Sequence, residues 1–250
     1  MAFPHRVGDG EHRVLVLHGW FGPGESWQAL LPHLDPTAFT YAFLDYRGYG
    51  SRRGEAGEYT VEEIARDALA TADELGWREF SLVGHSMGGM AMQKVYALAP
   101  ERVRRMVGVS PVPASGVPFD ERAWGLFSSA AGSPENRRRI INASTGGRRT
   151  DAWLDEMVRR SVETSDVAAF AAYLPSWAHG DFHEEVKGSA VPVKVVVGAH
   201  DAAITAELAR ATFGLWYPNF ELAVLDDAGH YPMDEAPVEL AGEIERFLAT

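Results

Sequence analysis

Residues 80–89 read FSLVGHSMGG, an apolar run that ends in the pentapeptide Gly84-His85-Ser86-Met87-Gly88 and opens a helical pattern. A serine on a sharp turn between a strand and a helix presents its hydroxyl clear of the sheet. Small neighbours are needed there because a Cβ atom would collide with the adjoining strand or helix. Gly89 further lets the helix pack closely. Ser86 is therefore the candidate nucleophile, and an ordinary turn in a glycine-rich loop is the alternative interpretation.

Two residues downstream are candidates for activating this serine. A serine hydroxyl needs a general base, and the base needs an acidic partner that fixes its tautomer. Asp201 follows the β-branched run at 193–197, and His230 follows a strand-like run at 220–225. Both side chains would emerge at the carboxyl edge of a parallel sheet, where open α/β sheets bind their ligands, and the chain order Ser, Asp, His is the order that follows such an elbow. Alternatively, Asp201 caps a helix that begins near Ile204, and His230 is a solvated loop residue.

The donors for a developing oxyanion are expected to be two backbone N–H groups. The run at 13–17 reads as a strand and leads into a His18-Gly19-Trp20 turn. The N–H of Trp20 would be one donor, and the N–H of Met87, at the start of a helix whose dipole favours negative charge, would be the other. The side chains of both residues would then be free to shape a pocket. Core packing is the alternative role for the Trp20 ring.

Strand-like and helix-like runs alternate along the chain, which predicts βα units and a mostly parallel sheet. The predicted strands are residues 13–17, 40–45, 80–83, 105–110, 193–197 and 220–225. The predicted helices are residues 26–34, 61–75, 87–98, 205–216 and 237–248. Thr60 and Glu63 have capping-box spacing at the start of the second helix. The Gly8-Asp9-Gly10 turn suggests a hairpin near the amino terminus.

Together these motifs resemble the α/β-hydrolase superfamily, and the similarity extends over nearly the whole chain. It is carried by His18-Gly19-Trp20, Asp45-Tyr46-Arg47-Gly48-Tyr49-Gly50-Ser51, Gly84-His85-Ser86-Met87-Gly88-Gly89, Gly198-Ala199-His200-Asp201 and Gly229-His230. Residues 177–182 and 191–193 are similar to the branch that contains esterases and cofactor-free haloperoxidases. The resemblance implies an α/β-hydrolase fold, with a mostly parallel central sheet flanked by helices, and a carboxylesterase-like activity.

Between residues 111 and 185 the strand signal disappears, and helical patterns interrupted by proline and glycine dominate. We expect one core domain, residues 1–110 and 186–250, with residues 111–185 inserted as a helical lid over the nucleophile. The candidate pocket-lining side chains are Trp20, Trp124, Phe127, Trp153, Met157, Phe170, Tyr173 and Trp177. For each one alone, packing between lid helices is the alternative role. As a group they favour an apolar substrate, aromatic or of medium chain length.

The amino-acid composition limits which partners the protein is expected to bind. The 250 residues carry 23 basic and 35 acidic side chains, a formal net charge of −12, which would repel nucleic acid. The arginine clusters at 137–139, 148–149 and 159–160 are expected on solvated helix faces. The sequence has no cysteine, no apolar run of about 20 residues and no charged leader before an apolar stretch. We therefore expect a cytoplasmic monomer or homodimer that does not bind a membrane.

A metal site is a further possibility. His179 and His183 are four residues apart with Asp181 between them, and on a helix that spacing can hold zinc. Gly180 disfavours a regular helix at this point, and the sequence has no H-E-x-x-H motif. We expect loop residues here rather than metal ligands, and an enzyme that needs no cofactor.

The expected activity is hydrolysis of a small apolar carboxylic ester or lactone through an acyl-enzyme. Ser86 would attack the acyl carbonyl, His230 would accept the serine proton, and Asp201 would orient His230. Hydrolysis of a carbon–carbon bond in a ring-cleavage product, or of a thioester, is the alternative within enzymes, because the same triad supports it. A small-molecule receptor built on the same fold is the alternative from another class.

Overall fold

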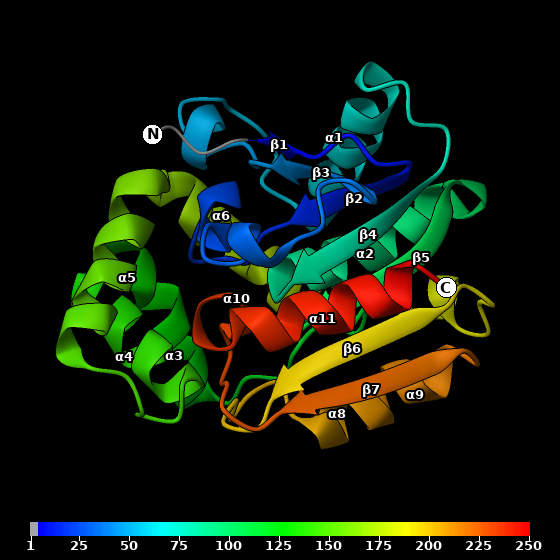
Figure 1. Ribbon diagram of the computed structural model, residues 1–250. Coiled ribbons are helices and arrows are strands. Elements are labelled where there is room, and N and C mark those ends of the chain that lie inside the picture. The colour runs from blue at the N-terminus through cyan, green and yellow to red at the C-terminus, as the bar shows by residue number, and fades with distance from the viewer. Residues whose placement is uncertain (1–4) are drawn as a thin grey trace.

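A single sheet runs through the centre of the computed structural model, which describes residues 5–250 (Figure 1). Its strands are β1 (Arg6–Val7), β2 (His12–Leu17), β3 (Phe39–Leu44), β4 (Phe80–His85), β5 (Val103–Val109), β6 (Val193–Gly198) and β7 (Phe220–Leu225). They lie in the order β1-β3-β2-β4-β5-β6-β7, and every neighbouring pair is parallel except β1 with β3. The predicted mostly parallel sheet is confirmed. The prediction about a leader falls partly on residues 1–4, outside the described residues.

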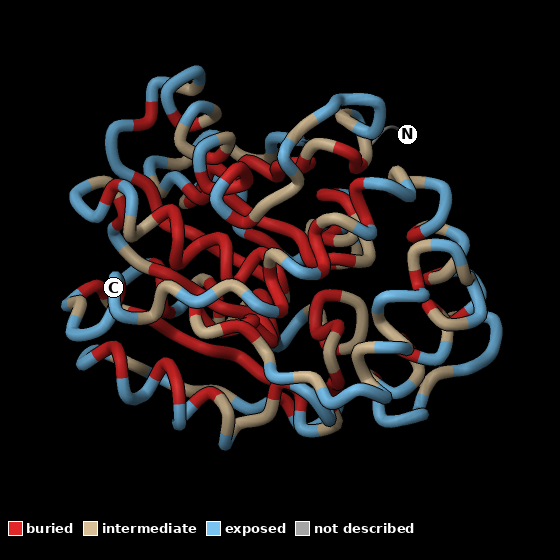
Figure 2. Tube along the Cα trace, turned by 180° about the vertical axis from the view of Figure 1, so that it is seen from behind, coloured by how far each residue is buried: buried red, intermediate tan, exposed pale blue. Residues whose placement is uncertain are grey.

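Both faces of the sheet are buried. Successive side chains of a strand point to opposite faces, so in β2 Leu15 and Leu17 join the core on one side, and Val14 and Val16 join the core on the other. All four are buried. Figure 2 shows, for the described residues, buried positions gathered in the interior of the molecule and exposed ones on its outer turns. This burial explains why the strands read as continuous apolar runs.

The core helices form a layer on each face of the sheet. They are α1 (Val61–Glu74), α2 (Met87–Leu98), α8 (Ala206–Ala211), α9 (Phe213–Trp216), α10 (Pro232–Glu235) and α11 (Pro237–Leu248). Ile64, Met90 and Phe213 place α1, α2 and α9 on one side, and Leu240 places α11 on the other. None of the helices in the described part of the chain is long and apolar enough to cross a membrane.

The remaining α-helices all lie between β5 and β6, as α3 (Glu121–Ser129), α4 (Pro134–Ser144), α5 (Asp151–Thr164), α6 (Val167–His179) and α7 (His183–Val186). We call residues 121–186 the helical insert. The four longer helices start at side-chain caps, which are Asp120, Ser133, Thr150 and Asp166. In Figure 1, α3, α4 and α5 gather beside the ends to which the strand arrows point. This part of the insert therefore lies beside the carboxyl edge of the sheet.

Two predictions near the amino terminus are wrong. β1 pairs antiparallel with β3 (Arg6 opposite Ala42) and not with β2, so residues 8–10 do not form a hairpin. This turn instead crosses the start of β3, where the N–H of Gly10 donates to Phe39 O at 3.3 Å. In place of a helix over residues 26–34 there are two short 3-10 helices, because Pro32 has no N–H to continue an α-helix.

The other predicted helices are largely confirmed. α1, α2 and α11 match their predicted ranges within a residue. At α1, the Thr60 side chain accepts from Glu63 N as predicted, but the Glu63 carboxylate accepts from the N–H groups of Glu58 and Tyr59 and so does not complete the capping box. The helix predicted at 205–216 breaks at Thr212, whose hydroxyl donates to Leu208 O at 2.7 Å. Such bonding back to the preceding turn bends helices.

Candidate active site

Ser86 occupies the sharp turn between β4 and α2, with φ 52° and ψ −117°. This backbone conformation is strained for a residue with a side chain, and it is held only because the surroundings enforce it. A Cβ atom at Gly84 would lie 2.3 Å from Gly88 O, and one at Gly88 would lie 2.6 Å from His18 O. The glycines of the pentapeptide are therefore required by close backbone packing, as the sequence suggested.

Asp201 and His230 are brought together by the ends of β6 and β7. The Nδ1–H of His230 donates to Asp201 Oδ2 at 2.6 Å. The other oxygen, Oδ1, accepts from the N–H groups of Ala203 and Ile204, both at 3.0 Å. The sequence left two roles open for Asp201, a cap of the following turn and a partner of His230. The structure contains both contacts, because one carboxylate oxygen caps the turn while the other binds the imidazole.

The Asp201 carboxylate is stabilised in its charged form. Burial pushes its pKa upward, but the charge of His230 and the hydrogen bonds from His230, Ile204 and Ala203 outweigh burial, so the pKa lies below its usual value. The carboxylate is therefore ionised at neutral pH. It fixes His230 as the tautomer with a proton on Nδ1, which leaves Nε2 to act as an acceptor.

Ser86 and His230 line one cavity beneath the helical insert. Its other walls are Trp20, Phe21, Val112, Val117, Phe119, Phe127, Ile140, Ser144, Trp177, Ala203, Ile204 and Tyr231. No hydrogen bond joins the Ser86 hydroxyl to His230 among residues 5–250, and in many hydrolytic sites this bond tightens only when substrate binds. The cavity has a volume of about 60 Å³.

Of the eight side chains predicted to line a pocket, Trp20, Phe127 and Trp177 do so. The other five lie elsewhere. Phe170 stacks on the Trp20 ring at 4.0 Å from behind, and the Tyr173 hydroxyl donates to Arg47 O. Trp124 stacks on His179, Trp153 packs edge-on against Tyr231, and Met157 borders a separate small cavity next to Phe21. These side chains mainly pack the insert onto itself and onto the core.

Several lining residues were missed by sequence reasoning. Phe21, Ile204 and Tyr231 each lie within three residues of a motif, so their position next to Trp20, Asp201 and His230 was the available signal. Val117, Phe119, Ile140 and Ser144 come from the segment between β5 and the end of α4. No motif marks them, and only the packing of the insert brings them to the cavity.

The two candidate oxyanion donors belong to residues near Ser86, because Met87 follows it in the chain and a Cβ atom at Gly19, next to Trp20, would lie 3.2 Å from Ser86 Cβ. Within the described residues, neither the N–H of Trp20 nor that of Met87 has an acceptor, so both are available to a ligand. The turn that carries Trp20 is fixed firmly. Its carbonyl accepts from the Tyr49 hydroxyl at 2.7 Å, and its indole N–H donates to Phe170 O at 2.7 Å.

Two buried histidines support the site. His18 donates from Nδ1 to Gly19 O at 2.7 Å, and His85 donates from Nε2 to His230 O at 2.8 Å. Burial lowers the pKa of His18 to about 4, against the opposing charge of Asp45. Burial, together with His230, lowers the pKa of His85 to about 3. Both rings are therefore neutral in the physiological range.

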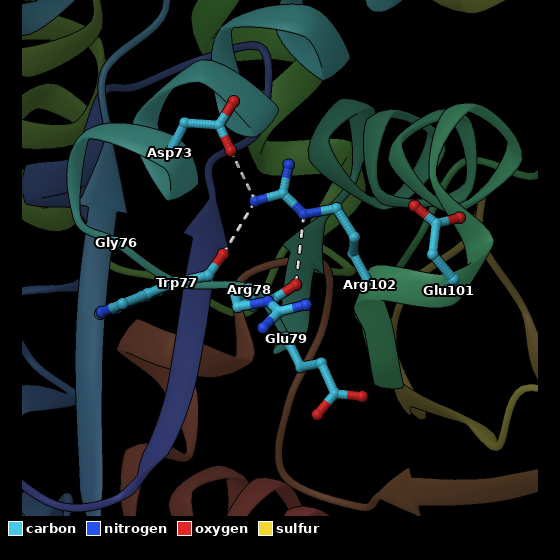
Figure 3. Close-up of a pocket in the computed structure, with 7 residues that line it drawn as sticks. All are labelled: Asp73, Gly76, Trp77, Arg78, Glu79, Glu101 and Arg102. Carbon is cyan, nitrogen blue, oxygen red and sulfur yellow. Dashed lines mark hydrogen bonds and ion pairs between the residues drawn. The ribbon is translucent and has the colours of Figure 1, made fainter.

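A larger hollow of about 750 Å³ lies at the opposite edge of the sheet, before the starts of β4 and β5 (Figure 3). It is lined by Asp73, Gly76, Trp77, Arg78, Glu79, Glu101 and Arg102. The Arg102 guanidinium is committed there to the carbonyls of Trp77 and Arg78 and to the Asp73 carboxylate. This open hollow holds no nucleophile paired with a base, so its larger size does not make it the catalytic site.

The candidate metal residues do not share a helix face, because α6 ends at His179 and α7 begins at His183. His183 pairs with Asp181 at 2.6 Å, while His179 stacks on Trp124. Within the described part of the chain, no group of three His, Cys, Asp or Glu side chains is placed to hold a metal ion.

The arginine clusters of the insert are mostly neutralised by carboxylates of the chain itself. Arg138 pairs with Asp151 and Asp155, for example. Arg137 departs from the expected solvated face, because it is 1 % exposed and stacks over Phe170 at 3.7 Å. Its donors bind neutral oxygens, including Ser161 Oγ at 2.8 Å.

The chain is similar to known proteins over most of its length. Residues 14–243 match the model of the alpha/beta hydrolase family. The chain is 30% identical over 219 residues to a 2-hydroxymuconate semialdehyde hydrolase of Pseudomonas putida, covering 82% of this chain and 75% of the relative. It is 25% identical to the pimeloyl-[acyl-carrier protein] methyl ester esterase of Serratia marcescens, covering 97% and 96%.

Among solved structures, an esterase from Exiguobacterium antarcticum superposes with a TM-score of 0.87 at 17% identity, covering 98% of this chain and 94% of that one. At this identity the likeness concerns the fold alone, and it confirms the predicted α/β-hydrolase fold. The family match covers most of the chain, and the curated relatives above are hydrolases by name. The chain therefore belongs to the alpha/beta hydrolase family and is a hydrolase.

Proposed function

We propose that the protein is a serine esterase that cleaves small, neutral carboxylic esters or lactones. The observation that carries this proposal is the 2.6 Å bond from His230 Nδ1–H to Asp201 Oδ2, next to a cavity that His230 shares with Ser86. That bond leaves Nε2 of His230, a residue that lines the cavity, as an acceptor. A neutral imidazole supported by a buried carboxylate is the base that a serine nucleophile needs.

In this mechanism the Ser86 hydroxyl attacks the acyl carbonyl while His230 Nε2 takes its proton. The carbonyl oxygen becomes an oxyanion, which the N–H groups of Trp20 and Met87 bind. His230 then returns the proton to the leaving alcohol, and the acyl group stays on Ser86. Water, deprotonated by His230, attacks the acyl-enzyme, releases the acid and restores the Ser86 hydroxyl. Asp201 stays ionised and stabilises the imidazolium in both steps.

The size of the cavity narrows the substrate. The cavity, of about 60 Å³, leaves room only for a small bound group. Pockets for drug-sized ligands are several times larger, about 300–1,000 Å³. We infer a short acyl chain, which is smaller than the medium-chain or aromatic group that the sequence suggested.

The charge of the cavity lining narrows the class of substrate further. No lysine or arginine is among its lining residues, and Ser144 offers a hydroxyl that already donates to Ile140 O. A carboxylate on the substrate would lose hydration there without gaining a cationic partner. We therefore place a neutral ester ahead of a ring-cleavage product such as 2-hydroxymuconate semialdehyde, on which the Pseudomonas putida relative acts by its name. Carbon–carbon and thioester hydrolysis remain the alternative reactions.

The test is a series of p-nitrophenyl esters from acetate to decanoate, measured with the wild type and Ser86→Ala. We expect the highest kcat/KM at acetate to butyrate, and a fall of at least about 10³-fold in the variant, because the nucleophile is lost. Slow, equal hydrolysis by both proteins would contradict the esterase proposal and favour the ring-cleavage or receptor alternative. A ligand that raises Tm without being turned over would support the receptor.

A further inference from the structure

The peptide group that joins His230 to Tyr231 is held at both of its polar ends. Its carbonyl, on His230, accepts from His85 Nε2–H at 2.8 Å. Its N–H, on Tyr231, donates to Glu235 Oε1 at 2.9 Å. The C=O and N–H of a trans peptide point in opposite directions in one plane, so two such bonds fix the orientation of that plane. The plane adjoins the Cα atom that carries the imidazole.

The first of these bonds comes from the nucleophile turn itself. A carbonyl oxygen only accepts, so His85 Nε2 must carry the proton, and one neutral tautomer is selected. His85 immediately precedes Ser86 in the chain, and its ring lies 5.0 Å from the ring of His230. The backbone of the base is therefore tied directly to the residue next to the nucleophile.

The second bond depends on a buried ion pair. Glu235 uses Oε1 for the Tyr231 N–H, and its Oε2 accepts from Arg149 Nε at 2.9 Å and Arg149 Nη2 at 2.6 Å. The Glu235 side chain is 0% exposed, whereas Arg149 is 24% exposed and reaches solvent. A carboxylate buried this deeply requires a cationic partner. Arg149 comes from the loop between α4 and α5, in the helical insert.

The insert also holds the other side of the base. The N–H of His230 donates to Ser144 O at 3.0 Å, at the end of α4. A Cβ atom at Gly229 would lie 2.7 Å from the same carbonyl, so the two backbones are in close contact. The main chain of His230 is thus fixed by the insert through Ser144 and Arg149, and by the nucleophile turn through His85.

We propose that Arg149 and Glu235 are positioning residues that hold the His230 imidazole in register with Ser86, and that they couple the helical insert to the catalytic base. The inference rests on the proposed function. Neither side chain is among the residues that line the cavity, so both act through the His230–Tyr231 peptide. The competing interpretation is that Glu235 only caps α10 and stabilises the fold.

The main test is the double variant Arg149→Met/Glu235→Leu, which removes both charges together. Replacing a buried ion pair by apolar side chains of similar volume often keeps or raises stability, so we expect an unchanged or higher Tm. We nevertheless expect kcat for p-nitrophenyl acetate to fall about 10- to 100-fold, because small misplacements of a catalytic group have effects of this size. KM should change less than about twofold, because the cavity walls are intact. Stabilisation alone predicts no loss of kcat in a stable variant.

Two further variants sharpen the comparison. Arg149→Met/Glu235→Gln restores an acceptor for the Tyr231 N–H and should recover part of the lost kcat. Arg149→Lys keeps the positive charge and should fold whether or not the double variant does. It should lower kcat about three- to tenfold, because lysine cannot make the bidentate contact of Arg149 with the Glu235 carboxylate. Arg138→Met is the matched control, since Arg138 lies in the same insert and pairs only with the exposed Asp151 and Asp155. It should match the wild type.

A second readout separates this inference from the proposed function. We would measure the rate at which a fluorophosphonate labels Ser86, and follow the far-downfield proton resonance of His230 Nδ1–H. We expect labelling to slow and the resonance to shift or broaden in the double variant, but not in Arg138→Met. A wild type that is neither labelled nor active on esters would overturn both proposals. A wild type that is active and labelled, with a double variant equal to it in kcat and labelling rate, would overturn this inference alone.

Discussion

At the scale of single residues, Asp201 shows how one side chain can meet two needs. Its Oδ1 satisfies two backbone N–H groups at the start of the next turn, and its Oδ2 binds the imidazole of His230. Because the two oxygens have separate partners, a substitution can remove one function while it keeps the other.

Asp201→Asn is the substitution that separates them. The amide oxygen can still accept from the N–H groups of Ala203 and Ile204, so we expect a small change in Tm. The amide NH₂ would face His230 Nδ1, which then becomes an acceptor, and the proton moves to Nε2, where it blocks base catalysis. In our proposed mechanism kcat falls about 10⁴-fold, the size that the wrong imidazole tautomer produces in a serine protease. Steady-state kinetics and thermal unfolding check this, and a kcat above a tenth of the wild-type value would contradict the assigned role.

At the scale of elements, α3 carries two aromatic side chains with different tasks. Phe127 lines the cavity and stacks with Trp20 at 5.9 Å, while Trp124 stacks on His179 and does not line the cavity. Sequence reasoning named both as lining candidates, because both are aromatic residues of the segment between residues 111 and 185. Their different positions give a matched pair of substitutions.

Phe127→Ala should enlarge the cavity by most of a phenyl ring. The wild type should prefer p-nitrophenyl esters in the range from acetate to butyrate. We expect Phe127→Ala to prefer hexanoate or octanoate instead, and its kcat/KM for acetate to be lower. Trp124→Ala removes a similar aromatic surface without opening the cavity, so it should leave the preferred chain length unchanged. The ester series with both variants is the measurement. The same optimum in Phe127→Ala and the wild type would show that this cavity does not hold the acyl chain.

The elements that could be predicted from the sequence are those fixed by local contacts. The elbow at 84–89 has a steric reason for each glycine, and the strand-like runs before Asp201 and His230 place those side chains at one sheet edge. The link from Arg149 to Glu235 could not be predicted, because it joins residues 86 positions apart and depends on how the insert folds back. The walls of the cavity supplied by α4 were missed for the same reason.

At the scale of the whole molecule, the buried neutral histidines make stability depend on pH. His18 and His85 lie in the fully buried interior below the site, with pKa values of about 4 and about 3, both lowered chiefly by burial. In the unfolded chain an ordinary histidine has a pKa of about 6.5. Between about pH 6.5 and pH 4, the unfolded chain therefore binds protons at these two histidines, whereas the folded protein does not.

The sign of the effect follows from this difference. Above pH 6.5 both states hold these histidines neutral, and their contribution to stability is complete. As pH falls below 6.5 the unfolded chain binds protons first, so the free energy of unfolding falls by up to about 1.4 kcal/mol per pH unit for each histidine. Asp234 acts in the opposite direction, because burial raises its pKa and the folded state then binds a proton first. Comparing variants at two pH values isolates the histidines from such groups.

We therefore expect the free energy of unfolding to decrease markedly between pH 7.5 and pH 5.0, and the decrease to be smaller by about 2 kcal/mol in His85→Gln, where one buried histidine no longer titrates. The glutamine amide does not titrate, and its NH₂ can still donate to the His230 carbonyl. His33→Gln is the control, since His33 is exposed and should leave the decrease unchanged. Urea unfolding at the two pH values is the measurement. An equal decrease in the wild type and His85→Gln would contradict a lowered pKa for His85 in the folded protein. Carboxylates and other groups would then account for the loss of stability at low pH.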